Sequence, residues 1–258
     1  MPECTGLEIR GVTLALRRAG RGPKVLFLHG AGGVPQWLPF FDALAERCEL
    51  WVPEHPGFGG SDDPPWIRSM ADLALFYLDF VEEAGLDRIH LIGNSLGGWL
   101  AAEMLIRDRS RFRSLVQLAP AGIRVKGVPP GDNFIWGPEE AVRNLFHDQT
   151  FADRMLALQP EAAQLDLLLK NRFTVAKLGW QPRWFDPDLE KWLHRIKLPA
   201  LVLWGDDDRI MPPAYAALWR ERLPEARLIM VEGCGHLPHV ERADVVAREV
   251  SSFLEEIG

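Results

Sequence analysis

Gly93-Asn94-Ser95-Leu96-Gly97 fits the pattern G-x-S-x-G, and the segments on either side of it indicate how the chain folds. A β-rich run over residues 88–92 comes directly before this motif, and an alanine-rich helical segment follows over residues 99–106. A sharp strand-to-helix turn needs residues without bulk on either side of the serine, and glycine meets that need. Ser95 is therefore the candidate nucleophile, placed where a helix N-terminus helps to stabilise developing negative charge.

The chain around this motif alternates short apolar runs with amphipathic segments, which is typical of strands joined by crossover helices. This pattern predicts an α/β fold with a mostly parallel central sheet and flanking helices. Predicted strands cover residues 7–18 as an antiparallel pair, then 25–28, 49–52, 88–92, 114–118, 200–204 and 227–231. Predicted helices cover residues 39–46, 70–84, 99–106, 213–222 and 243–256.

Residues 121–196 have a different pattern, with helical segments separated by proline, glycine and tryptophan and without a convincing buried strand. The alternation of strand and helix resumes after residue 196. We therefore predict one core formed by residues 1–120 and 197–258, with residues 121–196 inserted into it as a helical cap.

A serine hydroxyl is a poor nucleophile by itself, so it needs a histidine base that is held in the right tautomer by a third group. In this fold the acid is expected in a loop after a later strand, and the histidine after the final strand. Strand 200–204 is followed by Gly205-Asp206-Asp207-Asp208-Arg209-Ile210-Met211-Pro212, and strand 227–231 by Glu232-Gly233-Cys234-Gly235-His236. Both expected positions are occupied.

Five stretches resemble the serine hydrolase branch of the α/β-hydrolase superfamily, which includes carboxylesterases and carbon–carbon bond hydrolases. They are residues 29–30, 55–61, 93–98, 205–212 and 235–236. The resemblance implies that Asp208 is the acid of a catalytic triad, by the pattern Gly-x-x-Asp, and that His236 is its base. It also implies an oxyanion hole formed by the backbone N–H groups of Ala31 and Leu96, with Gly32 as an alternative donor.

Other polar residues near these loops stay open to interpretation. His239 follows the candidate base by three residues and would share a helical face with it, although the family pattern favours the histidine directly after glycine. His29 and His55 lie in loops at the same edge of the predicted sheet, and we interpret them as structural hydrogen-bonding groups. Asp206 and Asp207 are interpreted as loop-capping or solvated carboxylates.

Composition limits the partners and cofactors that we expect. The formal net charge of −7 offers no general basic field for nucleic acid or anionic lipid. The 3 cysteines fit neither a disulfide framework nor a zinc site, and no stretch has the character of a secretory signal or a membrane span. We expect a cytoplasmic protein without a metal or another cofactor, and without a nucleic-acid or membrane partner.

Substrate identity is the least determined property. The predicted substrate is a small or medium hydrophobic carboxylic ester or a related carbonyl compound, because cap aromatics could line an apolar pocket over the serine. The alternative is a carbon–carbon bond hydrolase of a ring-fission (meta-cleavage) product, and a third interpretation is a non-catalytic small-molecule receptor on the same fold. Candidate substrate contacts are Gly32, Asn94, Trp136, Arg172, Trp184 and Leu237.

Two of these contacts favour the carbon–carbon bond alternative by resemblance. Asn94 precedes the serine in those enzymes too, and Arg172 resembles an arginine with which they meet the substrate carboxylate. Leu237 speaks against it, since those enzymes commonly have tryptophan after the catalytic histidine. The plain interpretation of the cap aromatics as a group is that most of them hold the cap together and onto the core, and that one or two face the site.

Overall fold

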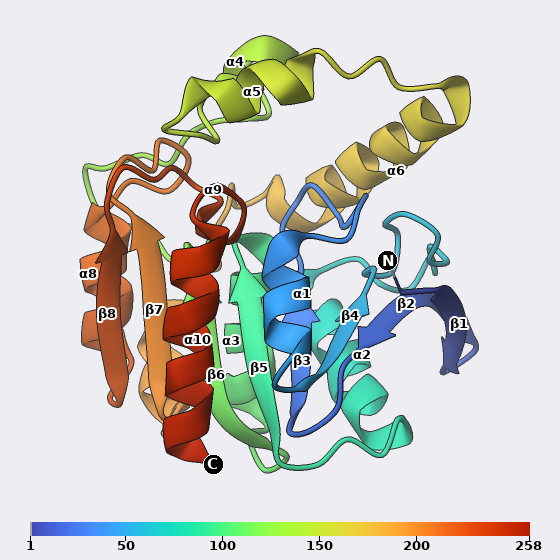
Figure 1. Cartoon of the computed structure of the whole chain (residues 1–258), viewed down its shortest axis with the longest axis vertical. Helices are drawn as coiled ribbons and strands as arrows, with labels where there is room; N and C mark the ends of the chain where they lie inside the picture. The colour runs from blue at the N-terminus through green and yellow to red at the C-terminus, as the bar shows by residue number, and fades with distance from the viewer. Residues whose placement is uncertain (1) are drawn as a thin grey trace.

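An eight-stranded sheet with helices on both faces organises the computed structural model, which describes residues 2–258 (Figure 1). The strand order is β1-β2-β4-β3-β5-β6-β7-β8. β1 (Cys4–Ile9) and β2 (Val12–Ala19) form an antiparallel pair, and β2 also runs antiparallel to β4. All the other neighbouring strands are parallel, so the predicted mostly parallel α/β fold is confirmed.

The central parallel strands are rich in buried apolar residues because helices cover both of their faces. β5 (Ile89–Asn94) and β7 (Ala200–Gly205) are buried at every position. The remaining parallel strands are β3 (Lys24–Leu28), β4 (Glu49–Pro53), β6 (Phe112–Leu118) and β8 (Ala226–Val231). Each of these strands was predicted by its short apolar run.

Two layers of helices enclose the sheet (Figure 1). α1 (Pro39–Ala45) and α10 (Ala243–Ile257) pack on one face. α2 (Met70–Glu83), α3 (Leu96–Arg107) and α8 (Ala214–Arg222) pack on the other face. The sheet therefore has a separate apolar core on each side, and both cores hold the strand ends in fixed positions.

The two strands that lead into the candidate site lie side by side at the middle of the sheet. From β3 the chain runs to β4 on one side, and it later returns to β5 on the other side of β3. Ligands of parallel α/β sheets commonly bind outside the carboxyl ends of two such strands. His29 and Gly30 follow β3, and Ser95 follows β5, so both motifs lie at this position.

Between β6 and β7 the described chain forms no strand, only one isolated β-bridge between Gly122 and Phe185. Its helices are α4 (Pro138–Arg143), α5 (Gln149–Leu156), α6 (Ala162–Gly179), α7 (Leu189–Trp192) and the 3-10 turn η1 (Leu193–Arg195). Figure 1 places α4, α5 and α6 beyond the carboxyl ends of the parallel strands. We keep residues 121–196 as the proposed extent of a cap. Over residues 2–258, no helix combines the length and the apolar character needed to span a bilayer.

The two halves of α6 differ in how they meet the core. In the second half, Lys170 Nζ and Thr174 Oγ1 donate hydrogen bonds to the backbone oxygens of Gly59 and Gly57, at 2.9 and 2.7 Å. In the first half every residue from 162 to 169 is exposed, including Leu165, Leu167, Leu168 and Leu169. An apolar helix end is thus exposed on the same side of the molecule as the carboxyl ends of the strands.

Candidate active site

Ser95 lies at a tight turn between β5 and α3, and α3 begins directly after it, three residues earlier than predicted. Its backbone has φ 51° and ψ −112°, which is a strained conformation for a residue other than glycine. A β-carbon on Gly97 would lie 2.0 Å from the backbone oxygen of Leu28, and one on Gly93 would lie 2.5 Å from the oxygen of Gly97. Both glycines are therefore required by close backbone packing, which holds the strained serine in place.

His236 reaches Ser95 from the loop that follows β8. Its Nε2 lies 2.9 Å from Ser95 Oγ, which is hydrogen-bonding distance. Both side chains are largely buried, with 8% of Ser95 and 2% of His236 exposed. The sequence-predicted serine and histidine, 141 residues apart, are brought together in a water-poor position.

Asp208 completes the line of hydrogen bonds from the loop after β7. Its Oδ2 lies 2.8 Å from His236 Nδ1. Its Oδ1 accepts hydrogen bonds from the backbone N–H groups of Ile210 and Met211, at 2.9 and 2.8 Å, so the carboxylate is oriented before any substrate is present. With Asp208 on Nδ1, the lone pair on Nε2 faces the serine hydroxyl, as a general base requires.

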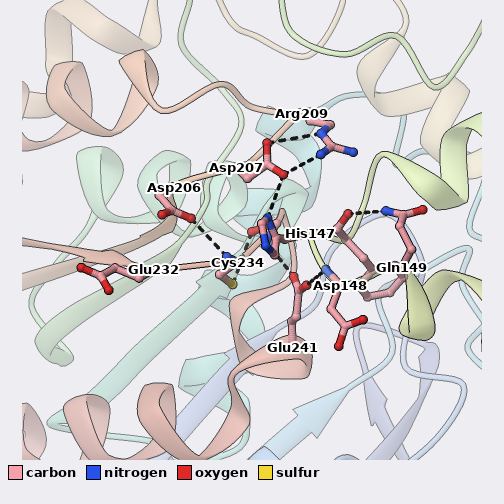
Figure 2. Close-up of polar contacts among 12 residues, drawn as sticks. His147, Asp148, Gln149, Asp206, Asp207, Arg209, Glu232, Cys234 and Glu241 are labelled. Atoms are coloured by element: carbon pink, nitrogen blue, oxygen red, sulfur yellow. Dashed lines mark hydrogen bonds and ion pairs between the residues drawn. The ribbon is translucent and has the colours of Figure 1, made fainter.

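The neighbouring aspartates have other partners, in agreement with the sequence interpretation. Asp206 Oδ1 accepts a hydrogen bond from the backbone N–H of Cys234 at 3.1 Å, and so caps the histidine loop. Near the surface, Asp207 forms an ion pair with Arg209 at 2.6 Å and a hydrogen bond with His147 at 3.0 Å (Figure 2). Neither carboxylate is hydrogen-bonded to His236.

The predicted oxyanion donors have N–H groups without an acceptor in the described part of the chain, residues 2–258. Neither Ala31 nor Leu96 donates a backbone hydrogen bond there. The loop that carries Ala31 approaches the serine closely, because a β-carbon on Gly30 would lie 3.3 Å from Ser95 Cβ. Gly32 is exposed, and a β-carbon on it would meet no atom within 4 Å.

His29 and His55 form a buried structural pair rather than part of the triad. Their rings stack at 3.7 Å, and the backbone N–H of His55 donates to His29 Nε2 at 2.9 Å. The ring of His55 also hydrogen-bonds to Tyr77 Oη and to the backbone oxygen of His29. These bonds agree with the interpretation that the two residues hold the loops after β3 and β4 together.

His239 lies on α9 (Pro238–Glu241), and it is buried. Its ring packs 5.7 Å from the rings of Phe27 and Phe40, within the core between the sheet and α1. Its Nδ1 has no hydrogen-bond partner in residues 2–258. Geometry therefore leaves His236 as the histidine that meets Ser95.

Buried histidines make the stability of the fold depend on pH. Burial lowers the pKa of His29 and of His90 from 6.5 to about 4, and that of His239 to about 3. Below pH 6.5 the unfolded chain binds protons that the folded chain excludes, so stability is complete above that pH and falls as the pH falls. We expect the free energy of unfolding to decrease from pH 6.5 towards pH 4 by about 1.4 kcal/mol per pH unit for each such histidine.

Urea unfolding at a series of pH values measures this slope. The variant His239→Leu keeps an apolar side chain beside Phe27 and Phe40 and removes one titrating group. The free energy of unfolding of this variant should therefore fall less steeply with falling pH, by about 1.4 kcal/mol per pH unit. Equal slopes for the two proteins would contradict the assignment.

The candidate substrate contacts lie in different surroundings. Asn94 is buried, and its Nδ2 donates to the backbone oxygen of Leu118 at 3.0 Å, so this side chain fixes the neighbouring strand. Trp184 is buried and stacks on Phe134 with ring centroids 5.0 Å apart, which is a packing role. Trp136 and Leu237 are half-buried.

Arg172 is exposed on α6, and within residues 2–258 it forms no ion pair or hydrogen bond. It differs in this from the lysines of the same helix, since Lys170 and Lys177 are bound to the loop after β4. The guanidinium group therefore has its full hydrogen-bonding capacity available for an anionic group.

Sequence reasoning missed the buried acidic residue that contacts the loop of His236. Glu241 ends α9, a short helix that the pattern of the sequence does not predict. Figure 2 shows its carboxylate among groups from the loop after β8 and from the segment before α5. A carboxylate five residues after His236 is the one signal in the local sequence, and its second partner, the N–H of Asp148, lies 93 residues away. In residues 2–258, no group of three or more histidine, cysteine, aspartate or glutamate residues is arranged to hold a metal ion.

Comparison with known proteins gives consistent relatives. A model described as the alpha/beta hydrolase family matches residues 25–249. The 2-hydroxy-6-oxo-2,4-heptadienoate hydrolase of Pseudomonas putida is 29% identical over 266 residues, which cover 95% of this chain and 93% of that protein. Lipase 1 of Psychrobacter immobilis is 27% identical over 267 residues, which cover 96% of this chain and 84% of that protein.

Among solved structures, a membrane phospholipase A described as a novel bacterial virulence factor matches with a TM-score of 0.82. It is 26% identical in sequence, and the match covers 99% of this chain and 86% of that chain. The matches therefore span nearly the whole length of the chain.

Proposed function

The chain belongs to the alpha/beta hydrolase family, and from that membership we propose that it is a cofactor-free serine hydrolase of small or medium hydrophobic carboxylic esters. The observation that carries the proposal is the continuous line of hydrogen bonds from Asp208 through His236 to Ser95. Each member is buried, and each comes from a different loop at the carboxyl end of the sheet. Membership of the family supports the statement that the protein is a hydrolase. The ester as its substrate is our proposal.

The proposed reaction runs in two halves. Ser95 Oγ attacks the ester carbonyl carbon while His236 Nε2 takes the hydroxyl proton, and the oxyanion accepts hydrogen bonds from the N–H groups of Ala31 and Leu96. The tetrahedral intermediate expels the alcohol, which leaves with the proton from His236, and an acyl group stays on Ser95. Water, deprotonated by His236, then attacks the acyl carbon, and the carboxylic acid is released with Ser95 protonated again.

Two observations support an apolar substrate. The exposed leucines at the start of α6 lie on the side of the molecule where the strands end, and Lipase 1 is among the relatives. Half-buried Trp136 and Leu237 add apolar surface in the segments around the site. A hydrophobic acyl chain would gain binding free energy from such surfaces in proportion to the area that it buries.

The second candidate is hydrolysis of a carbon–carbon bond in a dienoate from ring fission. It is favoured by the relative named for 2-hydroxy-6-oxo-2,4-heptadienoate, and by the exposed Arg172, which forms no ion pair in the described chain. By resemblance both kinds of enzyme retain the serine, so Ser95 does not distinguish between the two candidates. We place this candidate second because Leu237 follows His236, where such enzymes commonly have tryptophan.

A panel of substrates separates the candidates. We expect p-nitrophenyl esters of graded chain length to be turned over, with kcat/KM rising by about four-fold for each methylene that enters an apolar pocket. A preference of several decades for the dienoate, abolished in Arg172→Ala, would reverse the order of the two candidates. Arg195→Ala, in the turn η1, is the matched control for loss of an arginine.

Covalent labelling by a fluorophosphonate tests the shared chemistry independently of the substrate. We expect one equivalent of label on Ser95. A wild-type protein that takes no label, turns over neither class and yet binds a small molecule tightly would be a receptor, and the proposal of an enzyme would fail.

A further inference from the structure

The segment that carries His236 has no regular secondary structure, and its backbone is held by groups from elsewhere. The backbone N–H of Cys234 donates to Asp206, and the carbonyl of Gly233 accepts from Arg242 Nη2 at 2.7 Å. The N–H of His236 itself donates to the carbonyl of Leu145 at 2.8 Å. The position of the imidazole thus depends on contacts outside its own loop.

Glu241 supplies the remaining contact to this loop. Its Oε2 accepts a hydrogen bond from the backbone N–H of Gly235 at 2.6 Å, directly before His236. Its Oε1 accepts from the backbone N–H of Asp148, 93 residues away in the chain. Glu241 is 5% exposed and forms no ion pair in residues 2–258, so both of its oxygens serve backbone N–H groups (Figure 2).

The segment 145–148, which precedes α5, packs directly on the histidine loop. A β-carbon on Gly235 would lie 2.5 Å from the backbone oxygen of Leu145 and 2.8 Å from Phe146 Cα. Only a residue without a side chain allows this approach. The two segments therefore meet through backbone contacts, with the Glu241 carboxylate bridging them at one end.

We propose that Glu241 is a positioning residue that fixes the imidazole of His236 by joining its loop to the segment before α5. This inference rests on the proposed function, because it concerns the same histidine. A carboxylate can accept from two N–H groups at once, whereas an amide presents one oxygen and one NH2 group. Glu241→Gln therefore leaves one of the two backbone N–H groups facing a donor, and one of the two links is lost.

Small displacements of a base have large effects on rate. A misplacement of about 1 Å costs about 100-fold, so we expect Glu241→Gln to lower kcat by about 10- to 100-fold. KM should change by less than about two-fold, because Glu241 touches no group that binds substrate. Glu232→Gln is the matched control, since it makes the same chemical change on an exposed side chain of the same loop. Its kcat should equal that of the wild type.

Proton NMR provides a readout that needs no turnover. The imidazole proton shared by His236 Nδ1 and Asp208 should give a low-field signal, which His236→Ala removes and so assigns. We expect this signal to broaden or to shift in Glu241→Gln and to stay unchanged in Glu232→Gln. An unaltered signal, together with an unaltered kcat and a lower Tm, would show that Glu241 only stabilises the fold and would overturn the inference.

A second pair of variants tests the hydrogen bond between the backbone N–H of Asp148 and Glu241 by changing the donor. Asp148 has φ −78°, which proline can adopt, so Asp148→Pro removes the N–H donor while this φ is kept. Asp148→Ala keeps that N–H, and both variants lose the cap that the Asp148 side chain provides to α5. We expect lower kcat and an altered imidazole signal in the proline variant alone. Equal behaviour of the two variants would contradict the link.

The two hypotheses fail in different ways. Absence of fluorophosphonate labelling and of turnover in the wild type would reject the proposed function, and the imidazole signal would still decide the role of Glu241. Normal wild-type activity with full activity in Glu241→Gln and Asp148→Pro would reject the inference alone.

Discussion

Ser95→Ala is expected to reduce kcat/KM for the preferred ester by about 10⁴- to 10⁶-fold. The variant removes the oxygen on which the proposed acyl-enzyme would form, while the proposed oxyanion donors and substrate contacts remain and should give a small residual rate over water. The release of p-nitrophenol, followed by absorbance, measures the loss of kcat/KM. Intact-protein mass spectrometry measures the loss of fluorophosphonate labelling.

The fold of this variant should be intact, because alanine differs from serine only by the oxygen that meets His236. Circular dichroism and Tm are therefore expected to match the wild type. Ser252→Ala, on an exposed position of α10, is the control and should retain full activity. Substantial turnover by Ser95→Ala would mean that another group attacks the substrate.

Asp208→Asn is expected to lower kcat by about 10⁴-fold. The side-chain oxygen of the introduced asparagine can still accept from Ile210 and Met211, so the loop keeps its shape, but its NH2 group then faces His236 Nδ1. Nδ1 must become an acceptor, which places the imidazole proton on Nε2, and Nε2 can no longer take the proton of Ser95. Steady-state kinetics at saturating substrate measures the effect.

Asp207→Asn is the matched control, since it makes the same change at the next residue and removes only a pair near the surface. Its kcat should lie within about five-fold of the wild type, as the loss of an exposed ion pair predicts. If Asp207→Asn were the inactive variant and Asp208→Asn the active one, the assignment of the acid would be wrong by one residue.

Much of this arrangement follows from local sequence. Continuous apolar runs identify β5 and β7 because parallel strands are buried on both faces, and turn residues mark their ends. Strand ends of a parallel sheet meet at one edge, so placing Ser95, Asp208 and His236 after three strands is enough to predict that they meet. The start of α3 was predicted too late, because Gly97 and Gly98 are poor helix formers that are kept here by close packing.

Long-range contacts within the inserted helices and around Glu241 could not be predicted in the same way. Glu241 binds the N–H of a residue 93 positions away, and no spacing rule connects the two. Trp184 is one of several aromatic residues between β6 and β7, and its stacking on Phe134 depends on a left-handed backbone at φ 63°. Aromatic composition predicts that such residues pack, but it does not indicate which of them face the site.

The contrast between Gly97 and Gly32 has a consequence for protein engineering. Position 97 admits no other amino acid, because the strand beside it occupies the volume, whereas position 32 is open to solvent, with a φ outside the left-handed region, in the loop that approaches Ser95. A saturation library at position 32 would therefore vary steric selectivity near the scissile bond while the fold stays intact. Of these two glycines, position 97 should therefore be kept unchanged in directed evolution, and position 32 can be varied.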